Sequence, residues 1–261
     1  MGECLESLLG QTYRPLEIIV GNDGSRDATS DVVRRYPTVK LLDFPHRGKG
    51  PTINEAVSHA RGDILVFADA DLVYDREYVA ALANPIARGE CEGTSHATEL
   101  VANPANPWSR CLQFSTGLPP ELRLMLSDAE VAAGSIIFRA IRRERFVEVN
   151  GFEDTAFTDD ATLAPKLTFT ARFVREAKCR HYNPETLGEI FGRGRWMGKS
   201  LYLKYGSKAG GRFLPPFTLI HAARAAWRSK MLVMIPFTLA EDAGVALGVA
   251  ENSLRRLSRQ A

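Results

Sequence analysis

The chain has 261 residues, of which 45% are apolar and 25% charged, values typical of a globular protein with a buried core. Lys and Arg number 33 and Asp and Glu number 31, so no net field favours nucleic acid as a partner. The four cysteines lie far apart, so neither a zinc site nor a disulfide framework is indicated, and we expect a reducing compartment. The opening MGECLESLLGQ lacks the features of a secretory signal, which predicts cytoplasmic exposure.

The first half of the chain alternates short apolar runs with helical spacing. Strands are predicted at residues 16–20, 39–42 and 64–67, and helices at 27–35 and 52–60. This alternation indicates right-handed βαβ units in a mainly parallel sheet. Ligands bind such sheets beyond the carboxyl ends of the strands, so those ends are where chemistry is expected.

The second half is less regular. Its predicted elements are a strand at 94–100, a helix at 107–114, a strand at 135–138, a helix that begins at 158–160, a strand at 170–175 and a basic helix at 184–205. The apolar tail at 231–250 is interrupted by charge and proline and is too short to span a bilayer. It fits either a helix at the membrane surface or a core helix pair with a basic rim.

Basic residues gather in three runs, at 139–145, 193–208 and 255–259. A solvated face explains most runs of this kind, and contact with phosphate or a membrane surface is the alternative.

Two carboxylates, Asp69 and Asp71, follow the third predicted strand. At this spacing they can point into one cleft, where their repulsion is costly unless a cation neutralises it. Hard oxygen ligands suit Mg²⁺ or Mn²⁺, which complete their coordination with water and substrate phosphates. The pair therefore predicts a metal site that holds a diphosphate, although surface turns also produce the D-x-D pattern.

Two further segments lie at strand or helix ends. Asp23 opens the sequence DGS after the first strand, where it forms a turn or accepts hydrogen bonds from a base or ribose. Lys49 lies between two glycines ahead of a helix, where backbone N–H groups and its own charge favour an anion. The spacing is not that of a P-loop.

Three ordered segments, CLESLLGQTYRPLEIIVGNDGSRDAT, HRGKGPTINEAV and ARGDILVFADAD, resemble the nucleotide-binding half of family 2 inverting glycosyltransferases with the GT-A fold. The resemblance is dense over residues 4–71. It continues at 134–139, at 146–152 and in the triplet TDD at 158–160, which resembles the acceptor-side signature. The sequence GRGRWMGKS resembles the family's Gln-x-x-Arg-Trp element.

The resemblance implies a role for each matching residue. Asp23 would recognise the nucleotide, Asp69 would contact ribose or metal, and Asp71 would ligate the metal that holds the diphosphate. Asp160 would be the general base that takes the proton of the acceptor hydroxyl. Asp159, which replaces the usual Glu beside the base, would retain the charge with a shorter reach.

Arg195 and Trp196 would cover the diphosphate and stack on donor or acceptor, and a basic structural helix is the competing interpretation. Gly192 stands where the processive synthases of the family have Gln, and Asn22 stands where Asp is frequent. The first of these departures weakens a processive interpretation. The family also has an apolar strand ahead of the helix that here contains residues 4–9. Its absence predicts a truncated or misassigned start, unpaired ladder hydrogen bonds and an unfilled apolar slot.

These observations predict an α/β chain with a GT-A-like, mainly parallel Rossmann-like sheet and a C-terminal helical extension. Residues 1–102 would bind the nucleotide sugar, residues 103–183 would form the acceptor half of the same domain, and residues 184–261 would form the extension.

The expected activity is inverting transfer, with Mg²⁺ or Mn²⁺, from a UDP- or GDP-linked sugar to a glycan or lipid-linked acceptor. The expected location is the cytoplasm, at the inner face of the plasma membrane. The alternatives are a non-catalytic sugar-nucleotide-binding protein and a nucleotidyltransferase of related fold, and no nucleic-acid partner is expected.

Overall fold

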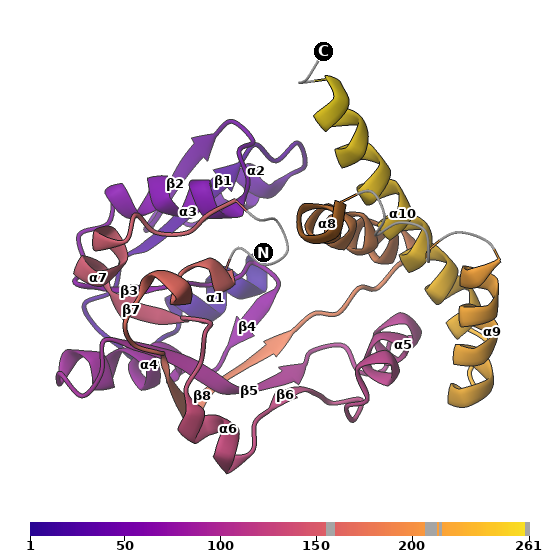
Figure 1. Cartoon of the computed structure of the whole chain (residues 1–261). Coiled ribbons are helices and arrows are strands. Elements are labelled where there is room, and N and C mark those ends of the chain that lie inside the picture. Colours follow the sequence, from indigo (N-terminus) through magenta and orange to yellow (C-terminus); the bar gives the residue numbers. More distant parts are fainter. Residues whose placement is uncertain (155–159, 207–212, 214–215, 259–261) are drawn as a thin grey trace. The chain divides into compact units, whose positions relative to one another are not determined.

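The structure, a computed structural model, describes residues 1–154, 160–206, 213 and 216–258 (Figure 1). Its strands are β1 (Ile18–Asp23), β2 (Val39–Phe44), β3 (Ile64–Val66), β4 (Leu72–Tyr74), β5 (Gly93–Val101), β6 (Leu122–Met125), β7 (Ala140–Arg142) and β8 (Arg172–His181). Its helices are α1 (Gly2–Leu9), α2 (Thr29–Arg34), α3 (Lys49–Ser58), α4 (Tyr78–Ala87), α5 (Pro107–Thr116), α6 (Asp128–Ala133), α7 (Arg143–Glu148), α8 (Leu187–Tyr205), α9 (Phe217–Ser229) and α10 (Met234–Ser258), with a 3₁₀ turn at Ala164–Lys166.

The described residues form two compact units. Unit one contains residues 1–102, 122–154 and 160–182, and unit two contains residues 103–121 and the described residues from 183 onward. Residues 103–121 therefore group with the C-terminal helices, whereas the sequence-based boundaries placed them with the strands that follow.

Unit one holds all the strands of the described residues, in two sheets. β1 pairs in parallel with β2, and the second sheet has the order β3-β7-β5-β8-β4, with β6 on β5. Only β5 and β8 are parallel in that second sheet; β7 runs antiparallel to both β3 and β5, and β4 runs antiparallel to β8. The α/β class and the C-terminal helical stretch are confirmed. The prediction of a mainly parallel sheet is corrected to a mixed one, because the apolar pattern of a strand does not encode its direction.

Most predicted elements form within a few residues of their expected bounds, and one strand does not. At 135–138 there is an isolated bridge between Ser135 and Ala171, and the strand forms later, as β7. The Ile137 N–H donates to the Ser135 hydroxyl at 2.9 Å, a local bond that takes the place of a ladder bond. Of the helix predicted from Thr158, residues 158 and 159 lie outside the described residues, and Asp160 lies in a 3₁₀ turn.

The core of unit one lies between α4 and the second sheet. Tyr78, Leu82 and Ile86 recur at four-residue spacing and are fully buried against Ala140 of β7 and Cys179 of β8. That spacing places the three side chains on one face of the helix, which is why a ten-residue helix can cover the sheet. This packing fixes the positions of β3 and β4, the two strands between which Asp69 and Asp71 lie.

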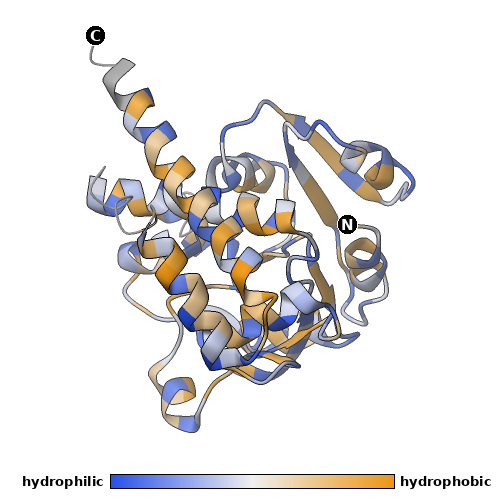
Figure 2. Cartoon of the chain, turned by 90° about the vertical axis from the view of Figure 1, so that its right-hand side faces the viewer, coloured by the Kyte–Doolittle hydropathy of each residue, from blue (hydrophilic) through white to orange (hydrophobic). Residues whose placement is uncertain are grey.

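Unit two is helical. α5, α8, α9 and α10 bury a shared apolar cluster that includes Leu112, Ile190, Ala226 and Phe237. Most of the tail predicted at 231–250 lies in α10, whose apolar residues are visible in Figure 2. Within the part of the chain that the structure describes, no helix is long and apolar enough to cross a membrane. Contact of these helices with a membrane surface stays a prediction.

Helices α8 and α10 approach closely through glycines. Gly194 and Gly198 of α8 are buried, and a Cβ at either one would overlap the backbone of α10. Gly244 and Gly248 of α10 repeat the four-residue spacing, and a Cβ there would overlap the carbonyl oxygens of Phe191 and Arg195. The absence of side chains at these positions lets the two backbones meet.

Gly248→Ala is therefore expected to lower the free energy of unfolding by about 1–3 kcal/mol, because the added methyl overlaps backbone that cannot move aside. Gly192→Ala is the control, since Gly192 lies in the partner helix α8 and a Cβ there meets no atom of another element within 4 Å. It should raise stability by up to about 1 kcal/mol through helix propensity. Urea unfolding of both variants tests this, and equal stability of the two would contradict the packing.

Candidate functional site

The backbone of Asp69 is held at the carboxyl end of β3 by buried side chains. The Tyr74 hydroxyl accepts from the Asp69 N–H at 2.8 Å and donates to the Asp69 carbonyl oxygen at 3.1 Å. The Cys4 thiol of α1 also donates to that carbonyl oxygen, at 3.5 Å. Side chains of β4 and α1 thus hold the turn that carries the Asp69 and Asp71 carboxylates.

The Asp69 carboxylate lies between two cations. Lys49 Nζ is 2.7 Å from its Oδ1, and Arg139 Nη1 is 2.7 Å from its Oδ2. Burial works to raise the pKa of Asp69, but the charges of Arg139 and Lys49 outweigh it and hold that pKa well below its usual range. Asp69 is therefore ionised, with one cation at each of its two oxygens.

Asp71 is the more open carboxylate, with a side chain that is 56% exposed. Its Oδ2 lies 3.2 Å from Nε2 of His181, the last residue of β8. Burial opposes ionisation of Asp71, but the hydrogen bond and charge of His181 outweigh it and lower the pKa of the carboxyl. The other ring nitrogen of His181 is buried and makes no hydrogen bond within the described residues.

Asp23 organises the loop between β2 and α3. Its Oδ1 accepts from the Arg47 N–H at 2.7 Å and from the Thr52 hydroxyl at 2.9 Å. Its Oδ2 accepts from the Gly48 N–H at 3.0 Å and lies 2.8 Å from His46 Nδ1. Gly48 has a φ of 102°, which glycine adopts readily, and α3 begins directly after it. The carboxylate thereby places Lys49 at the first turn of α3.

Asp23→Asn is expected to lower the free energy of unfolding at pH 7 by about 1–3 kcal/mol, because an amide turns an N–H₂ group toward the donors of the loop. Burial opposes ionisation of Asp23, but hydrogen bonds from Arg47, Thr52 and Gly48 lower its pKa below the usual value. A lowered pKa gives stability that is present above the ordinary carboxyl pKa of about 4 and is lost as pH falls through the native value.

The stability gap between wild type and Asp23→Asn should therefore narrow below about pH 4. Urea unfolding at pH 7 and pH 3 measures it. Asp31→Asn is the control, because Asp31 is exposed and pairs only with Arg34 in its own helix among the recorded ion pairs. A gap that is the same at both pH values would contradict a role for the Asp23 charge.

A cavity of about 500 Å³ brings most of the predicted site residues of unit one together. Its charged side chains are Glu17, Asp23, Lys49, Asp69, Arg139 and Asp160. The charge of Asp160 contributes to the raised pKa of Arg139, and both residues line the cavity. Three acids, Asp23, Asp69 and Asp160, and two cations, Lys49 and Arg139, thus line one cavity at the carboxyl ends of β1 and β3.

The remaining predicted residues lie elsewhere. Asp159 is outside the described residues. Arg195 and Trp196 belong to α8 in unit two, where the Arg195 guanidinium makes two 2.8 Å contacts with the Glu251 carboxylate and Trp196 is half-exposed. Their roles toward the donor and acceptor stay predictions.

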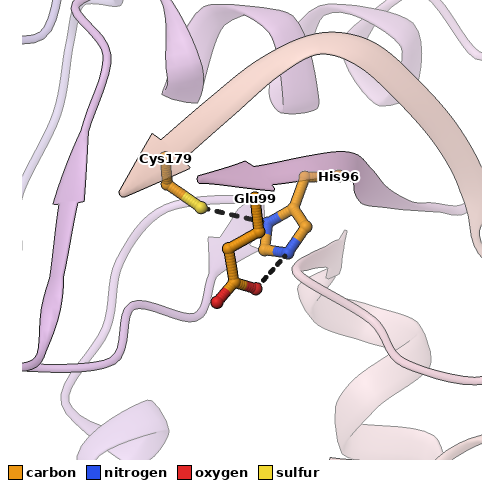
Figure 3. Close-up of side chains that lie close together, drawn as sticks. All are labelled: His96, Glu99 and Cys179. Carbon is orange, nitrogen blue, oxygen red and sulfur yellow. Dashed lines mark hydrogen bonds and ion pairs between the residues drawn. The ribbon is translucent and has the colours of Figure 1, made fainter. Parts of the chain in front are cut away.

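A second polar cluster is buried between β5 and β8 (Figure 3). His96 Nε2 lies 3.3 Å from Glu99 Oε2, and His96 Nδ1 lies 2.9 Å from the Tyr78 hydroxyl and 3.7 Å from Cys179 Sγ. Arg123 Nε lies 2.7 Å from Glu99 Oε1, and burial raises the pKa of the Cys179 thiol. Since Arg123 already supplies the positive charge, we interpret this cluster as a structural network.

Sequence reasoning missed two site residues, Arg139 and His181. Arg139 looked like one member of a basic run, and nothing in that run marks which side chain turns inward. His181 could have been found, because it stands at a strand end as the carboxylates do. The strand was predicted to end at residue 175, whereas β8 extends to 181.

Known proteins resemble this chain in sequence and in fold. The model of the glycosyl transferase family 2 matches residues 1–149, more than half of the chain. An Escherichia coli K12 protein named uncharacterized glycosyltransferase YibD is 33% identical over 97 residues, which cover 34% of this chain and 28% of that protein. The poly-beta-1,6-N-acetyl-D-glucosamine synthase of Staphylococcus aureus is 24% identical over 214 residues, which cover 74% of this chain and 50% of the synthase. The chain thus spans half or less of these curated relatives.

Among solved structures, residues 1–349 of S. aureus TarS in complex with UDP-GlcNAc superpose with a TM-score of 0.54 at 16% identity, covering 97% of this chain and 87% of that one. At this identity the likeness concerns the fold, and it confirms the predicted GT-A-like architecture. The match of the family model covers the strands that present Asp23, Asp69 and Asp71. The chain therefore belongs to glycosyl transferase family 2.

Proposed function

We propose that the chain transfers a sugar from a nucleotide diphosphate sugar to an acceptor hydroxyl, with inversion at the anomeric carbon and with Mg²⁺ or Mn²⁺ bound. The observation that carries the proposal is the cavity at the strand ends, where Asp160 and the Lys49–Asp69–Arg139 group share one lining. The acceptor hydroxyl needs a base, and the diphosphate leaving group needs positive charge nearby. Asp160 can supply the base, and Lys49 and Arg139 can supply the positive charge.

The residues at Asp71 fit a divalent cation. Asp71 offers a half-exposed, ionised carboxylate, and His181 offers an imidazole nitrogen 3.2 Å away. Carboxylate oxygens suit both Mg²⁺ and Mn²⁺, and an imidazole donor favours Mn²⁺ of the two. A bound cation would hold the diphosphate oxygens and offset the charge that develops on the leaving group.

The protein's own groups would carry the rest of the reaction. The acceptor oxygen attacks the anomeric carbon, the bond from that carbon to the diphosphate oxygen breaks, and the Asp160 carboxylate takes the hydroxyl proton. Lys49 and Arg139 bring positive charge to the same cavity, where they would favour the anionic donor and the departing nucleoside diphosphate. Asp23 supports this arrangement by fixing the loop that carries Lys49.

The test is to incubate the purified chain with Mn²⁺ or Mg²⁺ and UDP- and GDP-linked sugars, and to record nucleoside diphosphate and pyrophosphate separately. A UDP-sugar is the first donor to try, given the UDP-GlcNAc complex of TarS. Cell-surface polysaccharide and lipid-linked glycans are the proposed acceptors, in keeping with the name of the S. aureus synthase. Release of nucleoside diphosphate that is lost with chelator supports the proposal, and NMR of the product reports the anomeric configuration.

Two other outcomes would overturn it. Release of pyrophosphate would identify a nucleotidyltransferase, and donor binding without any turnover across donors and acceptors would identify a binding protein. Arg195→Ala should weaken donor binding, measured by isothermal titration calorimetry, if Arg195 covers the diphosphate.

His181→Gln is expected to raise the metal concentration that gives half-maximal activity by about 10- to 100-fold. The imidazole contacts the Asp71 carboxylate, and glutamine cannot reproduce its ring geometry. His59→Gln is the control, since His59 is exposed at the end of α3. An unchanged metal dependence in His181→Gln would show that this histidine does not support the metal.

A further inference from the structure

Exposed apolar side chains concentrate in one segment of unit two. Of the 17 large apolar side chains that are exposed among the described residues, six fall between residues 217 and 235. Trp227 and Leu232 are the most open of them, at 82% and 81% exposure. Isolated exposed apolar residues are ordinary, but a gathered set marks a contact surface. The six are Phe217, Leu219, Ile220, Trp227, Leu232 and Ile235.

Helix α9 has a buried face and an exposed apolar face. Thr218, Ala222 and Ala226 follow one another at four-residue spacing and are buried, so they mark the side that packs within unit two. The other side of the helix is exposed, and its apolar stripe consists of Leu219, Ile220, Ala223 and Trp227. These four also follow helical spacing, so they form one continuous stripe.

The tail predicted at 231–250 does not offer a comparable stripe. Its Met234, Phe237 and Val245 are buried, and the first two belong to the apolar cluster of unit two. The apolar surface that is open to contact is therefore α9 together with the turn that follows it, in which Leu232 protrudes.

Cations border this apolar stripe. Arg224 and Arg228 of α9 are exposed beside it, and the exposed Lys230 follows at the end of the helix. None of the three makes an ion pair with another described residue. In the sequence, residues 190–240 hold nine Lys and Arg and no Asp or Glu. The surface is thus apolar at its centre and positive along its side.

We propose that α9 and the turn after it dock on a lipid bilayer that carries anionic headgroups, with α9 lying in the plane of the surface. The apolar stripe would enter the boundary of the acyl chains, while the aliphatic stems of Arg224 and Arg228 let their guanidinium groups reach the lipid phosphates. Trp227 suits this boundary, because its ring system is apolar with one polar N–H. A second copy of the chain suits the surface less, because two such faces would bring like charges together.

This docking goes beyond the proposed transfer reaction and does not depend on it. Binding to vesicles is measured without donor, acceptor or metal. A chain that docks but transfers no sugar would contradict the proposed function alone, and an active chain that does not dock would contradict this inference alone.

The experiment measures co-sedimentation of the full chain with vesicles of phosphatidylcholine, with and without phosphatidylglycerol. Two double variants each remove one part of the surface. Trp227→Ser with Leu232→Ser removes the most exposed apolar contacts, and Arg224→Gln with Arg228→Gln removes two charges. All four side chains are exposed, so the fold should tolerate the changes.

Each double variant has a matched control in unit one. Met125→Ser with Ile136→Ser replaces two apolar side chains that are each 59% exposed. Arg35→Gln with Lys40→Gln removes two exposed cations. Both controls change composition as the test variants do but leave the proposed docking surface intact.

The wild type should bind vesicles with phosphatidylglycerol at least about tenfold more tightly than vesicles without it, because three cations approach the anionic surface. The apolar variant should bind at least about tenfold more weakly. The charge variant should lose most of the preference for phosphatidylglycerol, and both controls should behave like the wild type. Brominated lipid should quench tryptophan fluorescence in the wild type and much less in Trp227→Phe, which keeps an apolar ring at that position.

Four outcomes would overturn the proposal. The first is a wild type that binds neither kind of vesicle, and the second is equal binding by a test variant and its control. The third is binding that needs Arg224 and Arg228 but not Trp227 and Leu232, which would indicate a purely electrostatic partner such as an acidic protein. The fourth is a dimer in vesicle-free solution that the apolar variant dissociates, which would assign the surface to a second copy of the chain.

Discussion

Asp71→Asn is expected to lower metal-dependent release of nucleoside diphosphate by at least about a hundredfold, because the cation loses its charged ligand and the diphosphate its counter-charge. The substitution keeps the shape of the side chain and removes its charge. Activity is measured as kcat/KM across a metal titration with the best donor. The loss should not be recovered at high Mn²⁺ if Asp71 is the principal ligand.

Asp75→Asn is the matched control for that experiment. Asp75 lies four residues further along, and its side chain pairs at 3.5 Å with Arg180 on the surface. Its neutralisation should change activity less than about twofold, since exposed ion pairs contribute little. Equal losses in the two variants would indicate a general electrostatic effect, and full activity of Asp71→Asn would rule out the assigned metal role.

Asp160→Asn is expected to lower kcat by about 10²–10⁴-fold, since an amide cannot take the proton of the acceptor hydroxyl. Donor affinity should remain within a few-fold of wild type, because the general base acts on the acceptor and not on the diphosphate. Single-turnover kinetics and calorimetric titration of the donor separate the two effects. The split between kcat and donor affinity distinguishes Asp160 from Asp71, whose loss should reduce both.

The control for Asp160→Asn is Glu153→Gln. The Glu153 side chain is 60% exposed and pairs with Lys166 at 3.0 Å. Glu153 does not line the cavity. Its substitution should leave kcat nearly unchanged. A loss of donor binding in Asp160→Asn that matches its loss of turnover would contradict a base role and indicate that Asp160 supports the cavity charge through Arg139.

Sequence reasoning placed Asp23, Asp69 and Asp71 correctly at strand ends, because an apolar run followed by a polar loop is a local signal. The carboxyl edge of an α/β sheet then tells where those loops open. The family motifs added Asp160, which lines the same cavity as Asp23 and Asp69. Strand direction was beyond this reasoning, since β7 enters between β3 and β5 from a distant part of the chain.

The amino-acid sequence by itself thus determined the α/β class, the strand-end carboxylates and the family, because these depend on local patterns and motif order. Only the tertiary structure decided which charges meet. Arg139 reaches Asp69 across 70 residues, and His181 reaches Asp71 only because β8 pairs with β4. The same holds for the glycines that let α8 and α10 touch. Such contacts depend on how distant backbones pair and pack, and no local pattern encodes the partner.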